Sequence, residues 1–169
     1  DKGIVAYDGY AFRKIKGYDA EELQVLCFYE DTRSTLWVGT ANQGCFYIKD
    51  QQLHPVEQVT SKAIFDINED QYGRIWLGSF GGGLYLLSMK PDTCILERPG
   101  IVLYKHENAI TTIEKIADDE FLLGTYGSGI KHVKINAPDD FVLNDYQAEH
   151  IGKEDVVIWD MIKTTDRAI

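Results

Sequence analysis

The sequence predicts an all-β fold built from β-propeller blades, and three observations lead to this prediction. First, the chain repeats itself at about 40-residue intervals, the length of one blade, and the second glycine of a recurring pair stands at positions 3, 44, 83 and 129. Second, short segments rich in β-branched and aromatic residues alternate with turn residues, as antiparallel strands do. Third, no segment places apolar residues at helical spacing over about ten positions, which excludes a helical solenoid.

The strongest copy of the repeat shows how one blade is built. The run "IFDINE" from Ile64 reads as a strand, and "DQYG" follows it with Asp first and Gly last, as type I turns prefer. A second strand is expected at "RIWLGS", a third at "LYLLSM" and a looser fourth at "IVLYKHE", residues 101–107. A unit of about four antiparallel strands is the architecture of a propeller blade.

The repeat divides the chain into about four blades, and we interpret residues 1–169 as a single partial propeller. In this division 1–21 is the end of a blade, 22–60, 61–107 and 108–155 are whole blades, and 156–169 is the first strand of the next. An open arc of blades leaves strand edges unpaired, which invites association. We therefore expect either a fragment of a longer protein or two copies that complete a ring.

The glycine run at 78–83 raises the question of a phosphate-binding loop. Gly78 and Gly83 recur in copies that contain no phosphate motif, and the run is followed by a strand. A phosphate cradle would lead into a helix N-terminus, and the P-loop version would end in Lys-Ser or Lys-Thr. We expect these glycines to serve a turn with positive φ and a close approach of neighbouring blades, and we predict no cofactor.

Charge and hydropathy disfavour two classes of partner. The formal net charge is −10 and the pI is about 4.8, whereas nucleic-acid binders present a basic face. No apolar run approaches the roughly 18 residues that span a bilayer. We expect neither a nucleic-acid partner nor direct membrane contact for this segment.

Cysteine and histidine give no metal or disulfide signal. Cys27, Cys45 and Cys94 form neither a Cys-x-x-Cys motif nor an even disulfide set. Cys27 and Cys45 lie in apolar runs, so we expect buried free thiols there. The four histidines are far apart and lack ligand spacing, and no metal site is predicted.

The three tryptophans are interpreted as packing residues. Trp37 and Trp76 occupy the same strand position in two copies, which favours packing between adjacent blades. Trp159 aligns with Phe65 and Leu26 in the innermost strand, and we expect it to be in the core as well.

The full repeat reads apolar-x-x-apolar-x-x-Asp-x-x-Gly-x-apolar-Trp-apolar-Gly-Thr-x-x-x-Gly-apolar, and it resembles the two-component regulator propeller repeat. The copy "IFDINEDQYGRIWLGSFGGGLYLL" from Ile64 matches almost position for position. The copy from Leu26 matches with Ser34 in place of the turn glycine. The copy from Ile110 matches only in its second half, without the Asp-x-x-Gly turn or the tryptophan.

The resemblance implies a receptor function. Such repeats occur in the extracytoplasmic sensor regions of hybrid two-component systems of Gram-negative bacteria, where they form propellers that commonly have seven blades. These regions precede an immunoglobulin-like domain, a membrane helix and a histidine kinase, and many respond to oligosaccharides from complex glycans. For this chain, the resemblance implies a non-catalytic, periplasmic, ligand-sensing segment, expected to be homodimeric in its receptor. The 169 residues contain no kinase or receiver motif.

Strand order places the glycine turns and the connections between blades on one face, where propellers usually meet their ligands. Aromatic rings beside amides are what carbohydrate recognition uses, so we predict an oligosaccharide site on this face. The predicted ligand-binding residues are Asn42, Gln43, Phe80, Tyr126, Ser128 and His106, and the connecting loops add Glu107, Asn108 and His150.

Two alternatives stay open. One is a propeller fragment of a carbohydrate-active enzyme, a glycosidase or lyase, which would need a carboxylate pair about 5–10 Å apart facing the channel. The run "DQYGRIW" faintly resembles the sialidase Asp-box, but it has an extra residue and lacks the Ser. The other is a protein-interaction scaffold of WD40 type, whose repeat signature differs from this one.

Overall fold

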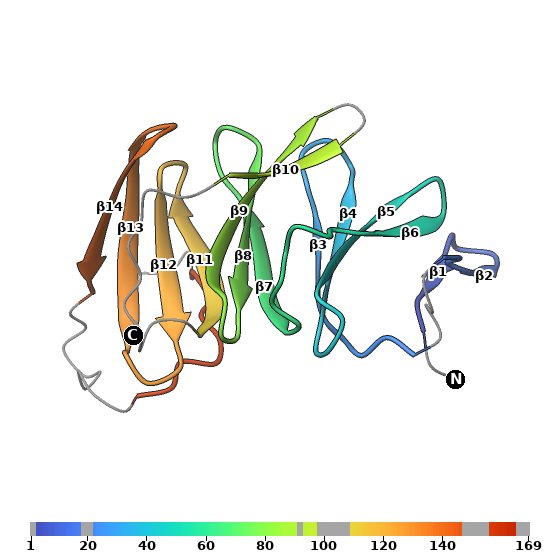
Figure 1. Cartoon of the computed structure of the whole chain (residues 1–169), viewed down its shortest axis with the longest axis horizontal. Helices are drawn as coiled ribbons and strands as arrows, with labels where there is room; N and C mark the ends of the chain where they lie inside the picture. Colours follow the sequence, from blue (N-terminus) through green and yellow to red (C-terminus); the bar gives the residue numbers. More distant parts are fainter. Residues whose placement is uncertain (1–2, 18–21, 91–92, 98–108, 147–155, 165–169) are drawn as a thin grey trace.

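The chain is all-β, and the computed structural model arranges its sheets side by side as an open arc of propeller blades (Figure 1). The structure describes residues 3–17, 22–90, 93–97, 109–146 and 156–164. Within these ranges there is no helix, so none that could span a membrane.

Three four-stranded antiparallel sheets follow one another along the chain, and we name them blades 1, 2 and 3. Blade 1 contains β3 (Val25–Glu30), β4 (Leu36–Thr40), β5 (Cys45–Lys49) and β6 (Gln52–Pro55). Blade 2 contains β7 (Ile64–Glu69), β8 (Arg74–Ser79), β9 (Gly83–Lys90) and β10 (Thr93–Glu97). Blade 3 contains β11 (Ile110–Ala117), β12 (Glu120–Thr125), β13 (Ile130–Ala137) and β14 (Asp140–Asp145). A hairpin of β1 (Val5–Tyr7) and β2 (Phe12–Lys14) precedes them.

The hydrophobic core lies between neighbouring sheets. One cluster joins Trp37 of blade 1 to Ile64 and Ile67 of blade 2, and a second joins Trp76 of blade 2 to Phe121 of blade 3 and its neighbours. Both tryptophans have no exposed surface. The prediction that they pack between adjacent blades is confirmed, and burial of such rings contributes much of the cohesion of the arc.

The glycine pair of each repeat has the two predicted roles. Gly83 has a φ of 69° and ends the turn that precedes β9. Gly78 lies against the next blade, because a Cβ placed there would come within 3.0 Å of the carbonyl oxygen of Ile110. In blade 1, Ser34 stands in the turn where blade 2 has Gly73, and it adopts the same left-handed conformation with a φ of 60°.

Polar contacts also tie the blades together. Glu69 of blade 2 accepts hydrogen bonds from the backbone N–H and the hydroxyl of Thr32 in blade 1, at 2.8 and 2.7 Å. Asp66 of blade 2 accepts from the N–H of Ile113 in blade 3 at 2.6 Å. Glu69 and Asp66 each accept hydrogen bonds from a neighbouring blade. These bonds, as well as apolar burial, therefore fix the relative positions of the blades.

Two strand predictions need correction. The fourth strand of blade 2 is Thr93–Glu97, which pairs with β9, rather than 101–107, which lies outside the described residues. Its register places Cys94 opposite Met89 and buries it, so the shorter segment already completes the sheet. Of the predicted strand at 156–169, the described residues 156–164 form a single bridge, between Val157 and Tyr126, and 165–169 lie outside the described residues. A ladder requires a neighbouring strand along its length, and the described residues supply none there.

Candidate functional site

The site predicted from sequence lies on the rim formed by the glycine turns. These are the turns between β4 and β5, between β8 and β9, and between β12 and β13, together with the connections that lead into each next blade. We name this edge the glycine rim. The turns between β3 and β4 and between β5 and β6 lie at the opposite ends of the strands, because all neighbours in the sheets are antiparallel (Figure 1).

Phe80 and Tyr126 occupy the same position in two successive glycine turns, directly after the Ser or Thr. The backbone N–H of Phe80 donates to the carbonyl of Ala63 at 3.0 Å, and its carbonyl accepts from the Ser61 hydroxyl at 2.9 Å. The N–H of Tyr126 donates to the carbonyl of Ala109, also at 3.0 Å. Both residues are therefore anchored by their backbones to an adjoining connection, while their side chains stay about half exposed.

Four aromatic rings meet at this point, and we name Phe65, Phe80, Tyr126 and Trp159 the aromatic quartet. Phe80 contacts Phe65 at 6.2 Å between ring centroids and Tyr126 at 5.9 Å. Trp159 closes the circle, at 5.8 Å from Tyr126 and 6.4 Å from Phe65. All four contacts are edge-to-face, the geometry that aromatic rings favour.

The prediction that Trp159 belongs to the core is wrong, because 63% of its surface is exposed. The alignment with Phe65 and Leu26 was informative, but the aligned position is a bulge. In β7 the register shifts between Ile64 and Asp66, which leaves Phe65 unpaired, and β3 shifts in the same way around Leu26. A bulge re-aims the extra side chain, and Leu26 is likewise 45% exposed.

The bulge of blade 3 explains how the rings reach each other across that blade. There the register shifts between Ile110 and Thr112, so that Thr111 takes the position of Phe65. Its side chain is small and buried, and its hydroxyl donates to the carbonyl of Ile158. A small residue at this place leaves room for Phe65 and Trp159 to meet.

The other predicted residues are distributed around the quartet. Asn42 and Gln43 lie in the glycine turn of blade 1, and the N–H of Gln43 donates to the Thr40 hydroxyl at 3.0 Å. Ser128 follows Tyr126 in the turn of blade 3, and its N–H donates to the Thr125 hydroxyl at 2.9 Å. Among the predicted residues that the structure describes, the ring contacts bring together Phe80 and Tyr126. His106, Glu107, Asn108 and His150 lie outside the described residues.

Two acidic residues lie close to the quartet, Asp66 directly after Phe65 and Asp160 directly after Trp159. Asp66 follows Phe65, and burial raises the pKa of its carboxyl, with the charge of Asp160 adding to this shift. The hydrogen bonds from Ile113 and Ile67 oppose the shift without cancelling it. Both carboxylate oxygens of Asp66 already accept bonds, one from the Ile67 N–H at 2.8 Å and the other from Ile113 and Thr112.

The described residues gather no group of three or more His, Cys, Asp or Glu side chains that would hold a metal ion. All three cysteines are free. Burial raises the pKa of Cys27 to about 12 and that of Cys94 to about 11, and it raises the pKa of Cys45 well above its ordinary value. The described part of the rim offers exposed aromatic faces and amides.

Comparison with known proteins agrees with the repeat. Residues 58–81 match the model of the two component regulator propeller family. This segment contains the Asp-x-x-Gly turn, Trp76 and the glycine turn that carries Phe80. None of the curated proteins shows significant sequence similarity to the chain.

A solved structure is similar over most of the chain. The extracellular domain of the hybrid two component system BT3049 from B. thetaiotaomicron superimposes with a TM-score of 0.61 at 26% sequence identity. The match covers 86% of this chain but 20% of the other. Both comparisons support the same assignment, a partial propeller similar to the extracellular region of a hybrid two-component sensor, and hence an extracytoplasmic segment.

Proposed function

We propose that this chain is a non-catalytic, ligand-sensing segment of the periplasmic region of a hybrid two-component sensor histidine kinase, and that its aromatic quartet binds a glycan-derived oligosaccharide. The observation that carries the proposal is the closed circle of ring contacts, with three of the four side chains between 47% and 63% exposed. Exposed rings offer the apolar faces on which the C–H surface of a sugar packs.

The rim is also built to hold its shape. Phe80 and Tyr126 are tied through their backbones to the connections at Ala63 and Ala109. A preorganised site loses less entropy on binding. Because the quartet joins the rim of blade 2 to that of blade 3 and to Trp159, a bound saccharide would bridge several segments and bias their relative positions, as a sensor requires.

The hydrogen bonds of Asp66 support binding rather than hydrolysis. A glycosidase uses two carboxyl groups that are free to reach the scissile bond. Asp66 is the carboxyl group with a raised pKa near the rings, yet its two oxygens are occupied by Ile67, Thr112 and Ile113. This arrangement favours a structural role for Asp66 over that of a general acid.

Tryptophan fluorescence tests the proposal, because Trp159 is exposed while Trp37 and Trp76 are fully buried. The purified sensor region would be titrated with defined oligosaccharides, for example cellohexaose, xylohexaose and maltoheptaose. We expect one of them to shift or quench the emission, and Trp159→Phe to remove that signal. Emission that changes equally in Trp159→Phe, or no response to any glycan in a broad panel, would count against the rim.

A matched pair of variants identifies the rings that contribute. Blade 1 has Ala41 at the position of Phe80 and Tyr126, and the N–H of Ala41 makes the equivalent bond to the carbonyl of Gln24 at 2.8 Å. Phe80→Ala and Tyr126→Ala therefore introduce the residue that blade 1 already has at this position. We expect each to weaken glycan binding by up to roughly tenfold, in the range of about 0.5–1.5 kcal/mol for an aromatic contact, with little change in stability.

We propose further that neighbouring blades of a longer receptor, or a second copy of the chain, cover the open end at the β1–β2 hairpin. Tyr7 and Phe12 stack there at 4.6 Å between centroids and are 60% and 76% exposed. Rings exposed to this extent mark an interaction surface. The molar mass in solution, measured over a range of concentrations, separates self-association from a monomer that needs further blades.

A further inference from the structure

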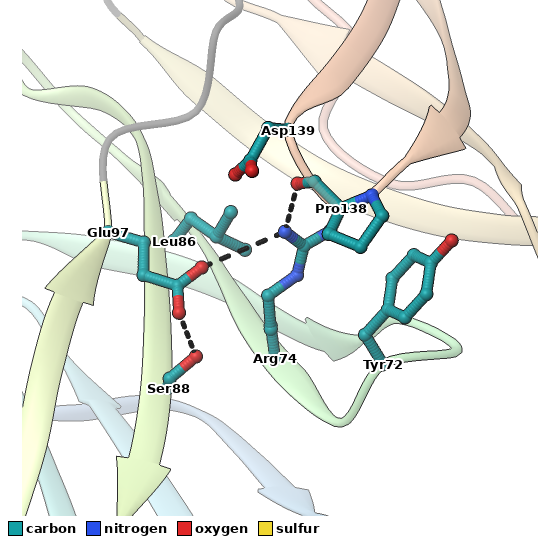
Figure 2. Close-up of a pocket in the computed structure, with 7 residues that line it drawn as sticks. All are labelled: Tyr72, Arg74, Leu86, Ser88, Glu97, Pro138 and Asp139. Atoms are coloured by element: carbon teal, nitrogen blue, oxygen red, sulfur yellow. Dashed lines mark hydrogen bonds and ion pairs between the residues drawn. The ribbon is translucent and has the colours of Figure 1, made fainter.

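The rim opposite the glycine rim contains two equivalent hollows, one at each boundary between blades. The first groove lies between blades 1 and 2 and has a volume of about 550 Å³. The second groove lies between blades 2 and 3 and has a volume of about 510 Å³ (Figure 2). In the repeat alignment, the residues Arg33, Thr35, Tyr47 and Lys49 of the first groove correspond to Tyr72, Arg74, Leu86 and Ser88 of the second.

The two grooves carry opposite charge. The described residues that line the first groove include three cations, Arg33, Lys49 and Lys90, and one anion, Asp50. The second is lined by one cation, Arg74, and by the carboxylates of Glu97 and Asp139. The whole chain has a net charge of −10, so the first groove is a local concentration of positive charge on an acidic protein.

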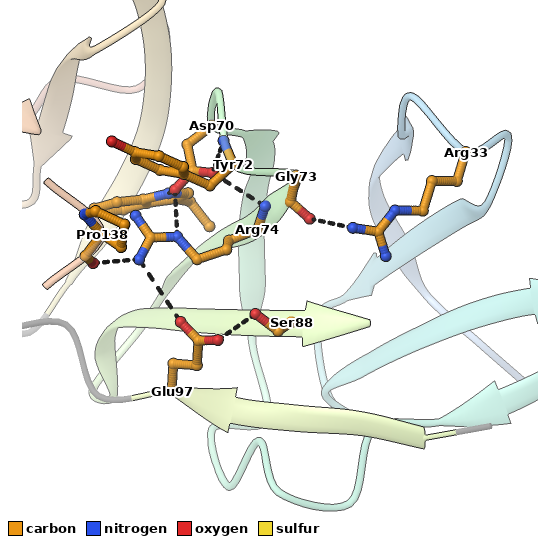
Figure 3. A network of polar contacts seen from close by, with 9 residues as sticks. Arg33, Asp70, Tyr72, Gly73, Arg74, Ser88, Glu97 and Pro138 are labelled. Carbon is orange, nitrogen blue, oxygen red and sulfur yellow. Dashed lines mark hydrogen bonds and ion pairs between the residues drawn. The ribbon is translucent and has the colours of Figure 1, made fainter. Parts of the chain in front are cut away.

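Carbonyl groups hold the positive charge of Arg33 in place, and Arg33 forms no ion pair with the residues that the structure describes. Its guanidinium donates to the carbonyl of Met89 at 2.7 Å. It also donates to the carbonyl of Gly73 at 3.3 Å (Figure 3). These acceptors belong to blade 2, so the side chain crosses the blade boundary and is fixed there. A carbonyl orients the guanidinium but carries no net charge, and the group keeps N–H donors for a further acceptor.

Arg74 in the second groove shows the opposite arrangement. Its Nε donates to Asp70 at 2.8 Å, and Glu97 lies 3.7 Å from its Nη1, which also donates to the Pro138 carbonyl (Figures 2 and 3). The rings of Tyr72 and Phe141 lie 5.1 and 5.2 Å from the guanidinium carbon. Arg74 is thus a buried, neutralised structural link.

The remaining side chains of the first groove suit a polar ligand that carries one negative charge. Lys49 and Lys90 are exposed, and neither forms an ion pair within the described part of the chain. The hydroxyls that line the groove belong to Ser34, Thr35 and Thr93, and the half-buried ring of Tyr47 supplies an apolar surface. Hydroxyls and ammonium groups around one ring match an acidic sugar better than a bare inorganic ion.

We propose that the first groove is a binding site for a small sugar acid, whose carboxylate or sulfate is held by Arg33, Lys49 and Lys90. The site is separate from the aromatic quartet, which lies at the other end of the strands, and the proposal does not depend on the quartet binding a glycan. The two lysines and the fixed guanidinium repel each other. Asp50 offsets part of that repulsion, and a bound anion relieves more of it.

Amide chemical shifts test the assignment with three probes. Galacturonate, galactose and inorganic sulfate would each be titrated into the ¹⁵N-labelled protein. We expect galacturonate to shift the amides of residues 33–35 and 47–50, and galactose, its neutral counterpart, to bind much more weakly. Galactose binding as well as galacturonate, or no shift with either, overturns the proposal. Sulfate binding without galacturonate binding overturns the sugar acid in favour of an inorganic anion.

Variants taken from the second groove show whether the charges carry the binding. Lys49→Ser copies Ser88, the residue that the repeat has at this position, and is combined with Lys90→Gln. We expect this pair to weaken galacturonate binding by roughly tenfold or more, while Lys62→Gln, which removes one positive charge on the glycine rim, has no effect. Unchanged binding in the double variant overturns the proposal. Phe80→Ala should leave galacturonate binding intact, which separates this site from the quartet.

Discussion

The carboxylate of Asp70 accepts a hydrogen bond from the indole N–H of Trp76, with Oδ2 and Nε1 2.9 Å apart. The other oxygen of Asp70 accepts from the backbone N–H groups of Tyr72 and Arg74, at 2.9 and 3.0 Å. One buried carboxylate therefore closes the turn between β7 and β8 and fixes the ring that fills the space between blades 2 and 3. The Asp-x-x-Gly-x-apolar-Trp spacing is the length needed to bring these groups together.

Blade 1 repeats this arrangement with nearly the same geometry. Asp31 accepts from the indole N–H of Trp37 at 2.9 Å and from the N–H groups of Arg33 and Thr35 at 3.0 and 2.8 Å. Blade 3 has Leu122 in place of the tryptophan and turns tightly, with Ala117 paired to Glu120. The aspartate and the tryptophan are absent together there, as expected if each is useful only with the other.

Asp70→Ala should therefore destabilise the protein strongly. The change leaves the indole N–H of Trp76, two backbone N–H groups and the buried guanidinium of Arg74 without their acceptor. Removal of one partner of a buried ion pair costs about 3–5 kcal/mol. Urea denaturation followed by fluorescence would measure the loss.

Asp118→Ala is the matched control, because the Asp118 side chain is 89% exposed and its ion pair with Lys115 spans 3.7 Å. We expect it to change the free energy of unfolding by less than about 0.5 kcal/mol. Equal effects of the two substitutions would show that Asp70 does not hold the turn.

The repeat predicts the blades well because its main signals are local. Paired glycines, β-rich runs and the Asp-x-x-Gly turn lie within about 25 residues of one another, the scale at which hairpins form. The packing role of Trp76 follows from its recurrence. The hydrogen bond from Trp76 to Asp70 does not, because a spacing of six residues becomes a contact only once the hairpin is closed.

The aromatic quartet shows where sequence reasoning ends. The place of Phe80 and Tyr126 in the turns predicts their position. Phe65 joins them through a bulge that re-aims its side chain, and Trp159 joins them from the segment that follows blade 3. The contact between Phe65 and Trp159 links residues on either side of blade 3. The contact also depends on the small Thr111 between them. A repeat alignment does not show that side chains from successive blades meet at this point.

Gly39→Ala should destabilise the chain because two blades meet at this position. A Cβ on Gly39 would overlap the sulfur of Cys27 and come within 2.8 Å of the carbonyl oxygen of Ile64 in blade 2. Overpacking of this kind costs about 1–3 kcal/mol. Denaturation in urea measures the change, and we expect the slope of the transition to remain the same.

Gly81→Ala separates steric overlap from backbone strain. Gly81 has a φ of 82°, but a Cβ there would meet nothing within 4 Å. We expect a cost of about 1 kcal/mol from the left-handed backbone alone. A Gly81→Ala variant that loses as much stability as Gly39→Ala would contradict the close approach of blades 1 and 2.

The three thiols should resist alkylation in the folded protein. Burial raises the pKa of Cys27 to about 12 and that of Cys94 to about 11, and the pKa of Cys45 is shifted upward as well. Because the thiolate is the reactive form, iodoacetamide at about pH 8 should modify none of them in the native state and all three in guanidinium chloride. Mass spectrometry counts the adducts, and rapid modification of the native protein would show that the inter-blade core opens.

Asp66→Asn should remove one component of the pH dependence of stability. Burial raises the folded-state pKa of Asp66 above its ordinary value of 3.8, so the folded state binds a proton more readily than the unfolded state. The contribution of Asp66 is then most favourable below pH 3.8 and is lost as the pH rises through the raised pKa. Between about neutral pH and pH 4, the wild type should gain stability relative to Asp66→Asn as the pH falls. Denaturation curves at several pH values, with ¹³C titration of the carboxyl group, measure this difference.

Asp8→Asn is a control, because the pKa of Asp8 is lowered in the folded protein whereas that of Asp66 is raised. The N–H groups of Ala11 and Tyr10 lower the pKa of Asp8, so its contribution is present above the unfolded-state pKa and is lost as the pH falls through the folded-state value. The difference in stability between wild type and Asp8→Asn should therefore shrink on acidification, whereas that between wild type and Asp66→Asn shifts in favour of the wild type. If both stability differences move in the same direction, the burial of Asp66 between blades 2 and 3 does not control its titration. The contacts of Asp66 with Ile113 and Thr112 would then be looser than the 2.6 and 3.1 Å distances show.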